Sequence, residues 1–215
     1  GMERAERNVS IYMELYPPTA FFISPSYARF MGNLTLKMGR RFPVKTLLGW
    51  NEPGYSLPAV RAGLEELWRR ISLEPEVKAC DAYGMIETGY LGFECRRQQG
   101  IHGFEDAYLY EIIDPVTKEL LKPGEEGELV VTHLEREGMP LIRYRTGDIT
   151  TLDDAPCSCG RTHVRMKGIK GRWAERLEVK GIPVYPSQVD EAMAGIREYQ
   201  GGYNILVDGD RAVDH

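Results

Sequence analysis

The sequence lacks a hydrophobic run long enough to cross a membrane, and its N-terminus lacks the pattern of a signal peptide. A membrane-spanning helix needs about 20 consecutive apolar residues. A signal peptide combines a basic start with an apolar stretch and a cleavage site. Neither is present, so we expect a cytoplasmic protein that does not act on or in a membrane.

Cysteine is also scarce, with 4 among 215 residues, at positions 80, 95, 157 and 159. Secreted domains that rely on disulfides are much richer in cysteine, whereas a few thiols in a chain without a signal peptide are typically reduced or bind metal. The sequence therefore favours free thiols or metal ligands over disulfides.

Clustered positive charge and glycine-rich phosphate motifs are absent as well. The formal net charge is -5, and lysine and arginine are scattered along the chain, which argues against nucleic acid as a partner. The patterns GxGxxG after a strand and GxxxxGK[ST] do not occur, which argues against a stand-alone dinucleotide enzyme and a P-loop ATPase.

Strand and helix signals alternate over the first 90 residues. Apolar runs at 19–24, 44–50 and 76–83 predict strands. Ser24-Pro25-Ser26 and Ser56 with Pro58 precede segments with apolar residues at helical spacing, and serine followed by proline is typical of a helix start. Strand–helix–strand–helix–strand predicts an α/β fold with a parallel sheet.

The pattern changes near Gly92. Strands predicted at 108–113, 128–134 and 141–150 are separated by turns and not by helices, which indicates an antiparallel, barrel-like subdomain. After Gly171, residues 176–186 predict a hairpin, Ser187 a helix start, and 203–207 a strand, as in a small, truncated α+β C-terminal domain. We expect three parts, 1–92, 93–171 and 172–215, with the GIKGR stretch at 168–172 as the second boundary.

Distinctive loops follow each strand predicted for the parallel sheet, at residues 24–26, 49–54 and 83–89. Ligands of open parallel sheets bind beyond the carboxyl ends of the strands. A single loop of this kind is more often only a tight turn, but three at one edge predict a ligand site. Further along, Asp148 ends the stretch RYRTGD, where it either caps a turn or accepts hydrogen bonds from the hydroxyls of a ribose.

Residues 157–160 read CSCG, and a Cys-x-Cys pair needs two further ligands to complete a tetrahedral zinc site. Cys80 lies in an apolar strand and is predicted to be core. Cys95 and His102 flank a turn at a spacing that suits chelation, and His163 is the competing nitrogen ligand. The residues available to complete the pair are Cys80, Cys95, His102, His133 and His163.

Ordered motifs carry a family resemblance. GWNEPG (49–54), DAYGMIETG (81–89), EIIDPVTKELLKPGEEGELVVT (111–132), PLIRYRTGD (140–148) and GRWAERLEVKGIPVYPSQVDE (171–191) resemble the adenylate-forming acid–CoA ligases, and most of all the phenylacetate–CoA ligase branch. The resemblance implies an AMP-forming acid–thiol ligase. Such an enzyme uses ATP and magnesium to turn an aryl or acyl carboxylate into an acyl-adenylate, and coenzyme A then displaces AMP.

The resemblance also assigns roles to residues. Glu87 becomes the magnesium ligand, Asp148 the ribose-binding carboxylate, and Arg172 the arginine that reaches the nucleotide, so that Glu87 and Arg172 are the catalytic residues. The acyl pocket is expected beside Tyr83, Gly84 and Met85. The full set of nucleotide-binding residues is Glu52, Pro53, Asp81, Tyr83, Gly84, Met85, Asp148 and Arg172.

Members of this branch resemble the cysteine arrangement too, with a Cys/His turn facing a Cys-x-Cys-Gly hairpin. This resemblance favours Cys95, His102, Cys157 and Cys159 as a closed zinc site. Because protein side chains would fill all four positions, the zinc would be structural rather than catalytic.

The sequence also departs from the family. The Ser/Thr/Gly-rich phosphate loop belongs upstream of Pro17 and the catalytic lysine beyond His215, while the hinge position after Arg172 holds Ala174. We therefore expect a central-to-C-terminal portion of a ligase that is inactive in isolation. Two alternatives stay open, namely adenylyl transfer to a deazaflavin cofactor and a non-catalytic, zinc-stabilised nucleotide-binding module. A homodimer is also left open.

Overall fold

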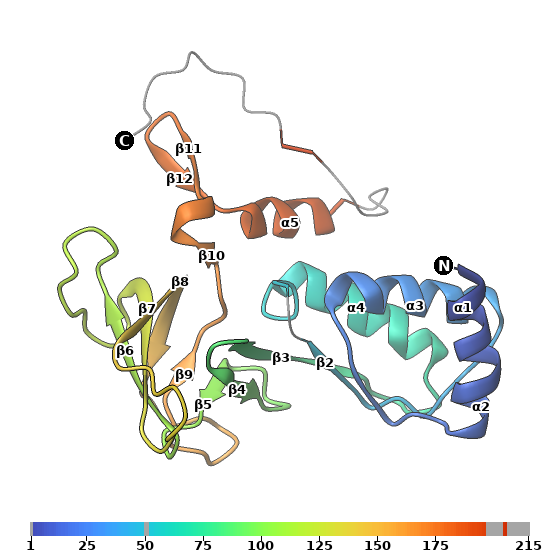
Figure 1. The fold of residues 1–215 in the computed structure, drawn as a ribbon. Coiled ribbons are helices and arrows are strands. Elements are labelled where there is room, and N and C mark those ends of the chain that lie inside the picture. The colour runs from blue at the N-terminus through green and yellow to red at the C-terminus, as the bar shows by residue number, and fades with distance from the viewer. Residues whose placement is uncertain (1, 50–51, 197–203, 206–215) are drawn as a thin grey trace.

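The structure is a computed structural model that describes residues 2–49, 52–196 and 204–205 (Figure 1). Its helices are α1 (Met2–Arg7), a π-helical turn (Asn8–Tyr12), α2 (Met13–Leu15), α3 (Pro25–Lys37), α4 (Pro58–Ile71), a 3-10 turn (Trp173–Glu175) and α5 (Pro186–Ala194). The strands are β1 (Ala20–Phe22), β2 (Thr46–Gly49), β3 (Lys78–Met85), β4 (Gly89–Glu94), β5 (Ile101–Gly103), β6 (Tyr108–Ile113), β7 (Glu126–His133), β8 (Tyr144–Asp153), β9 (Arg165–Met166), β10 (Gly171–Arg172), β11 (Leu177–Val179) and β12 (Ile182–Val184). None of the described helices is long and apolar enough to span a bilayer.

One mixed sheet organises the chain. Its strands follow the order β1-β2-β3-β4-β5-β9-β8-β7-β6, with β10 joined to β8. The pairs β1–β2 and β2–β3 are parallel, and the pairs from β3–β4 onward are antiparallel. The predicted parallel α/β segment is therefore confirmed. The sheet passes without a break across residues 92–93 through β4.

Helices α3 and α4 lie together on one face of the parallel strands (Figure 1). Proline in the first turn of each helix fixes a helical φ where no intrahelical N–H bond is needed. Each helix buries its apolar stripe, and Trp68 of α4 is fully buried and donates from its indole N–H to the carbonyl of Ala28, 3.0 Å away. This packing forms the first apolar core.

The antiparallel strands enclose a second apolar core around Leu91, Ile101, Leu129 and Met166. Strand β6 and the hairpin β11–β12 match their predicted positions, and β7 and β8 begin or end within three residues of theirs. The predicted barrel does not close within the described residues, because β1 and β6 end the sheet path at opposite edges. The subdomain is an open, curved continuation of the parallel sheet.

Two predicted helix starts are shifted. The N-cap of α4 is Leu57 and not Ser56, and it makes no side-chain cap. Glu191 of α5 supplies an acceptor instead, because its Oε1 lies 2.9 Å from the backbone N of Ala59. Ser187 lies inside α5, where its hydroxyl donates to the carbonyl of Lys170.

Other elements could not be recognised in the sequence. The N-terminal helical segment of residues 2–15 and the strands β4, β5 and β9 were not predicted. Of the strand predicted at 203–207, Asn204 and Ile205 are described and belong to no strand, while the rest lies outside the described residues. The stretch proposed as a boundary, 168–172, ends in β10, which pairs with β8 through Gly171–Ile149 and Arg172–Asp148.

Candidate nucleotide and metal sites

The loops after the parallel strands meet at one edge, as the topology requires. Ser26, just after β1, donates its backbone N–H to Oε1 of Glu52, in the loop after β2, over 2.7 Å. Pro53 follows on the surface. The predicted residues Glu52 and Pro53 therefore lie at the carboxyl ends of β1 and β2, where open parallel sheets bind ligands.

Gly84 lies in β3 directly against the backbone of β4. The register of the two strands shifts between Tyr83 and Gly84. A Cβ atom at Gly84 would lie 2.5 Å from the carbonyl oxygen of Gly89 and 2.8 Å from Cα of Tyr90. Any side chain here would force the strands apart, so glycine at this position preserves the register shift near the end of β3.

Three predicted site residues from distant motifs come together at Asp148. The hydroxyl of Tyr83 donates to Oδ2 of Asp148 over 2.6 Å, and Nε of Arg172 lies 3.5 Å from Oδ1. Tyr83 and Asp148 are buried, whereas Arg172 is exposed. Burial raises the pKa of Asp148, while the Tyr83 hydroxyl and Arg172 oppose the rise. The group is a buried carboxylate beside an exposed cation, and the carboxylate is a suitable acceptor for hydroxyl donors.

Asp81 lies two residues before Tyr83, so both side chains point to the same face of β3. Its Oδ2 accepts from the hydroxyl of Ser56 and its Oδ1 from the backbone N–H of Ala82, 2.9 Å away. Burial raises the pKa of Asp81 to about 6. Each oxygen keeps a second lone pair, so this fixed carboxylate can still accept from a ligand.

Glu87 sits at the tip of the turn between β3 and β4 and is exposed, while Met85 is half-buried against the second core. The backbone around Glu87 is held by side chains of the loop after β7 and of β6. Arg136 donates to the carbonyl of Glu87, and the hydroxyl of Tyr108 donates to that of Thr88, each over 2.7 Å. The Glu87 carboxylate is thus presented to solvent on a fixed turn, as a cation ligand requires.

Four side chains predicted to bind metal are gathered in one cluster. The ligand atoms of Cys95, His102, Cys157 and Cys159 all lie within 4.8 Å of one another. Sγ of Cys95 is 3.9 Å from Sγ of Cys157, and Nε2 of His102 is 3.6 Å from Sγ of Cys159. The other nitrogen of His102, Nδ1, is buried without a partner.

The surroundings of the cluster separate its members from the other candidates. His163 is exposed and stands outside the cluster, and the buried Cys80 points its thiol at the carbonyl of Cys95. Within the cluster, the backbone N–H of Arg161 lowers the pKa of Cys159 to about 7, while burial raises the pKa of Cys95. Burial also raises the pKa of Cys80, to about 12. A thiol that ionises easily is the better metal ligand, which favours Cys159 over Cys80.

No protein-family model matches the chain. It is 36% identical to a phenylacetate-coenzyme A ligase of Thermus thermophilus over 212 residues, 97% of this chain and 46% of that enzyme. It is 32% identical to a phenylacetate-coenzyme A ligase of Pseudomonas putida over 209 residues, 94% of this chain and 44% of that enzyme. The chain is a homologue of the phenylacetate–CoA ligases.

Solved structures agree with this relationship. A crystal structure of 2-hydroxyisobutyryl-CoA ligase in the postadenylation state, in complex with R3-HIB-AMP, matches with a TM-score of 0.82 and 29% identity over 91% of this chain and 41% of that one. The same enzyme in the thioesterification state, with 2-HIB-AMP and CoA, matches with a TM-score of 0.71 over the same shares. The chain spans less than half the length of these relatives.

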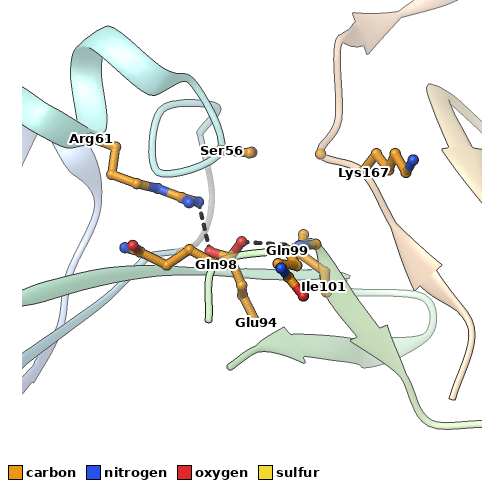
Figure 2. A pocket seen from close by; sticks show the side chains of 9 residues that line it. Ser56, Arg61, Glu94, Gln98, Gln99, Ile101 and Lys167 are labelled. Carbon is orange, nitrogen blue, oxygen red and sulfur yellow. Dashed lines mark hydrogen bonds and ion pairs between the residues drawn. The ribbon is translucent and has the colours of Figure 1, made fainter. Parts of the chain in front are cut away.

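Beside the candidate nucleotide residues, the structure shows a cavity of about 250 Å³ that the sequence did not reveal (Figure 2). Its walls come from the start of α4, the β4–β5 turn and the segment before β10, and its lining residues are Ser56, Arg61, Glu94, Gln98, Gln99, Gly100, Ile101, Lys167 and Gly168. Glu94 and Arg61 form a largely buried ion pair over 2.6 Å. Neither residue belongs to a sequence motif. Only their contact in the folded structure identifies them as candidate functional residues.

Proposed function

We propose that this chain forms part of an AMP-forming acid–CoA ligase that activates an aryl or acyl carboxylate as an acyl-adenylate and passes the acyl group to coenzyme A. The observation that carries the proposal is the meeting of Tyr83, Asp148 and Arg172, which come from separate sequence motifs. The names of the homologous ligases, and the acyl-adenylates in the matched structures, support the same reaction class.

The residues have distinct tasks in this proposal. Asp148 accepts hydrogen bonds from the ribose hydroxyls, and Asp81, Tyr83 and Gly84 line the adenine side. Arg172 is exposed beside Asp148, where its guanidinium can leave the carboxylate and compensate charge on the phosphate as pyrophosphate departs. The remaining nucleotide-side residues are Glu52, Pro53 and Met85.

Glu87 is the proposed magnesium ligand. An exposed carboxylate on a fixed turn suits magnesium, which retains several waters and takes one or two protein carboxylates together with substrate phosphates. When bound, the ion would neutralise phosphate charge during attack by the carboxylate.

We further propose that Cys95, His102, Cys157 and Cys159 hold a structural zinc ion. Tetrahedral zinc with zinc–sulfur bonds of about 2.3 Å places its sulfur ligands about 3.8 Å apart. The 3.9 Å between the Cys95 and Cys157 sulfurs and the 3.6 Å between His102 and Cys159 fit this geometry. Nε2 is the proposed ligand nitrogen of His102, because it is the ring atom that faces Sγ of Cys159. The three-part division at residues 92 and 171, the cytoplasmic location and a homodimer remain predictions.

The function is tested on the complete protein that carries this chain. Pyrophosphate release is measured with a panel of aryl and aliphatic acids, with and without coenzyme A, and AMP binding is measured by calorimetry. Asp148→Ala should weaken AMP binding by about 1.5–3 kcal/mol, the range for a hydrogen bond to a charged group. The control Asp106→Ala changes an exposed carboxylate and should leave AMP binding unchanged.

Unchanged AMP affinity in folded Asp148→Ala would reduce Asp148 to a turn residue. Pyrophosphate release with every acid but no thioester would instead indicate a different acceptor for the adenylate, such as a deazaflavin hydroxyl.

A further inference from the structure

Glu94, at the end of β4, is a buried carboxylate that accepts from three directions. Its Oε2 accepts from the backbone N–H of Asp81 over 3.0 Å and from Nη2 of Arg61 over 2.6 Å. Its Oε1 accepts from the backbone N–H of Gly100 over 3.2 Å. Figure 2 shows the Glu94 side chain between Arg61 and the turn that follows β4. The carboxylate therefore joins β3, α4 and the β4–β5 turn.

The guanidinium of Arg61 compensates the charge of the buried Glu94 carboxylate. A buried carboxylate is strongly disfavoured unless a cation and hydrogen bonds compensate it. The side chain of Glu94 is 3% exposed and that of Arg61 is 15% exposed. Arg61 also donates from Nε to the carbonyl of Tyr55. Its guanidinium is thus held at both ends, and the position of Glu94 is fixed with it.

The ion pair of Glu94 and Arg61 fixes the position of Asp81. Its backbone is held by Glu94, and its side chain is held separately by Ser56 and by the N–H of Ala82. A carboxylate fixed at both main chain and side chain loses little freedom when it accepts one more hydrogen bond. The pairing of β3 with β4 does not by itself require the buried ion pair of Glu94 and Arg61.

We propose that Glu94 and Arg61 are positioning residues that hold Asp81 so that its carboxylate recognises the exocyclic amino group of adenine. The proposal rests on the proposed function, which places Asp81 on the adenine side. Glu94 and Arg61 do not touch the nucleotide. They act through Asp81, and their loss should weaken recognition of the base amino group while the ribose contact at Asp148 remains.

The test compares AMP with purine riboside 5′-monophosphate, which lacks the amino group, by calorimetry on the complete protein. Glu94→Gln keeps the side-chain shape but turns one acceptor into a donor that faces a backbone N–H. We expect AMP affinity to fall about 10-fold, as for loss of one charged hydrogen bond, while affinity for the analogue changes less than about 2-fold. The AMP preference should therefore nearly disappear.

Arg61→Lys and Arg61→Met keep the inference testable if Glu94→Gln does not fold. Lysine retains the cation and should preserve most of the AMP preference, whereas methionine should lose it. The matched control Glu111→Gln alters a glutamate paired with Arg143 on an outer strand and should leave both affinities unchanged. Equal weakening of both ligands in Arg61→Met would overturn the inference, since a general structural defect does not distinguish them.

Asp81→Ala, which removes both carboxylate acceptors, separates this inference from the proposed function. If it leaves the AMP preference intact, then Asp81 does not read the amino group and both the assignment and the inference fail. If it abolishes the preference while folded Glu94→Gln and Arg61→Met retain it, the assignment of Asp81 stands and the positioning role is wrong.

Discussion

The parallel region (residues 20–85) and the antiparallel region (residues 89–172) have differently composed interiors. Around Trp68, Leu64 and Leu47, the parallel region buries a continuous apolar cluster beneath two helices. The antiparallel region also has an apolar core, but it buries charged or metal-ligating side chains beside it, among them Glu94, His102, Glu128 and Arg165.

The two regions are therefore stabilised by different interactions, apolar burial in one and, beside an apolar core, paired buried charges in the other. Burial of apolar area is non-directional and follows from the spacing of hydrophobic residues along the chain. A buried charge is stable only when a particular partner meets it, as Arg145 meets Glu128 over 2.5 Å. The parallel region should therefore resist loss of any one polar contact, and the antiparallel region should depend on a few of them.

The largest expected effect is removal of the proposed zinc. Zinc binding to small structural sites contributes about 10–16 kcal/mol in peptides at neutral pH, more than any one side chain. Chelation, or Cys157→Ser, should abolish metal content and increase amide hydrogen exchange in β5, β8 and β9, while exchange in α3 and α4 changes little.

Elemental analysis gives the metal content, and mass spectrometry gives the exchange. Cys80→Ser is the matched control, because its thiol lies outside the cluster, and it should retain the metal. A purified protein without metal, in which all four thiols titrate freely, would eliminate the site.

The next effect concerns the apolar core of the parallel region. Trp68→Ala removes a fully buried ring that packs against Phe21, and such truncations cost about 3–5 kcal/mol. The free energy of unfolding should fall by that amount. Amide hydrogen exchange should increase more in α3 and α4 than in β6–β8. If exchange rises equally in both regions, the two cores unfold as one unit and the contrast between them is wrong.

The smallest expected effect lies at the junction, in Asp81. The folded chain keeps its proton up to about pH 6, while the unfolded chain loses it near 3.8. The free energy of unfolding should therefore fall as pH rises from about 4 to about 6 and then level off. Asp81→Asn removes this dependence and should stabilise the protein by about 1–3 kcal/mol at pH 7.5.

Urea unfolding at several pH values measures this effect. The advantage of the asparagine variant should shrink steadily below pH 6. An advantage that is the same at pH 4 and pH 7.5 would show that the carboxylate charge is not its cause.

The same contrast explains what the sequence could predict. Periodic apolar residues and serine–proline starts placed β1–β3, α3 and α4, since these signals lie within each segment. The ordered motifs around Tyr83, Asp148 and Arg172 identified residues that the structure brings together. The bonds of Glu94 with Asp81, Arg61 and Gly100 could not be predicted, because they depend on how distant segments cross. The barrel-like character predicted for the antiparallel subdomain is not confirmed, and the described residues form no closed barrel. Closure depends on the order of strands, which strand signals do not contain.

The bond between Ala59 and Glu191 has a consequence for the order of synthesis. The two residues are 132 positions apart, and a ribosome adds about 5–20 residues per second. Helix α4 therefore leaves the ribosome roughly 7–26 s before its acceptor is made. Throughout that interval water must satisfy the N–H of Ala59, so the nascent chain holds an open helix end until α5 has been made.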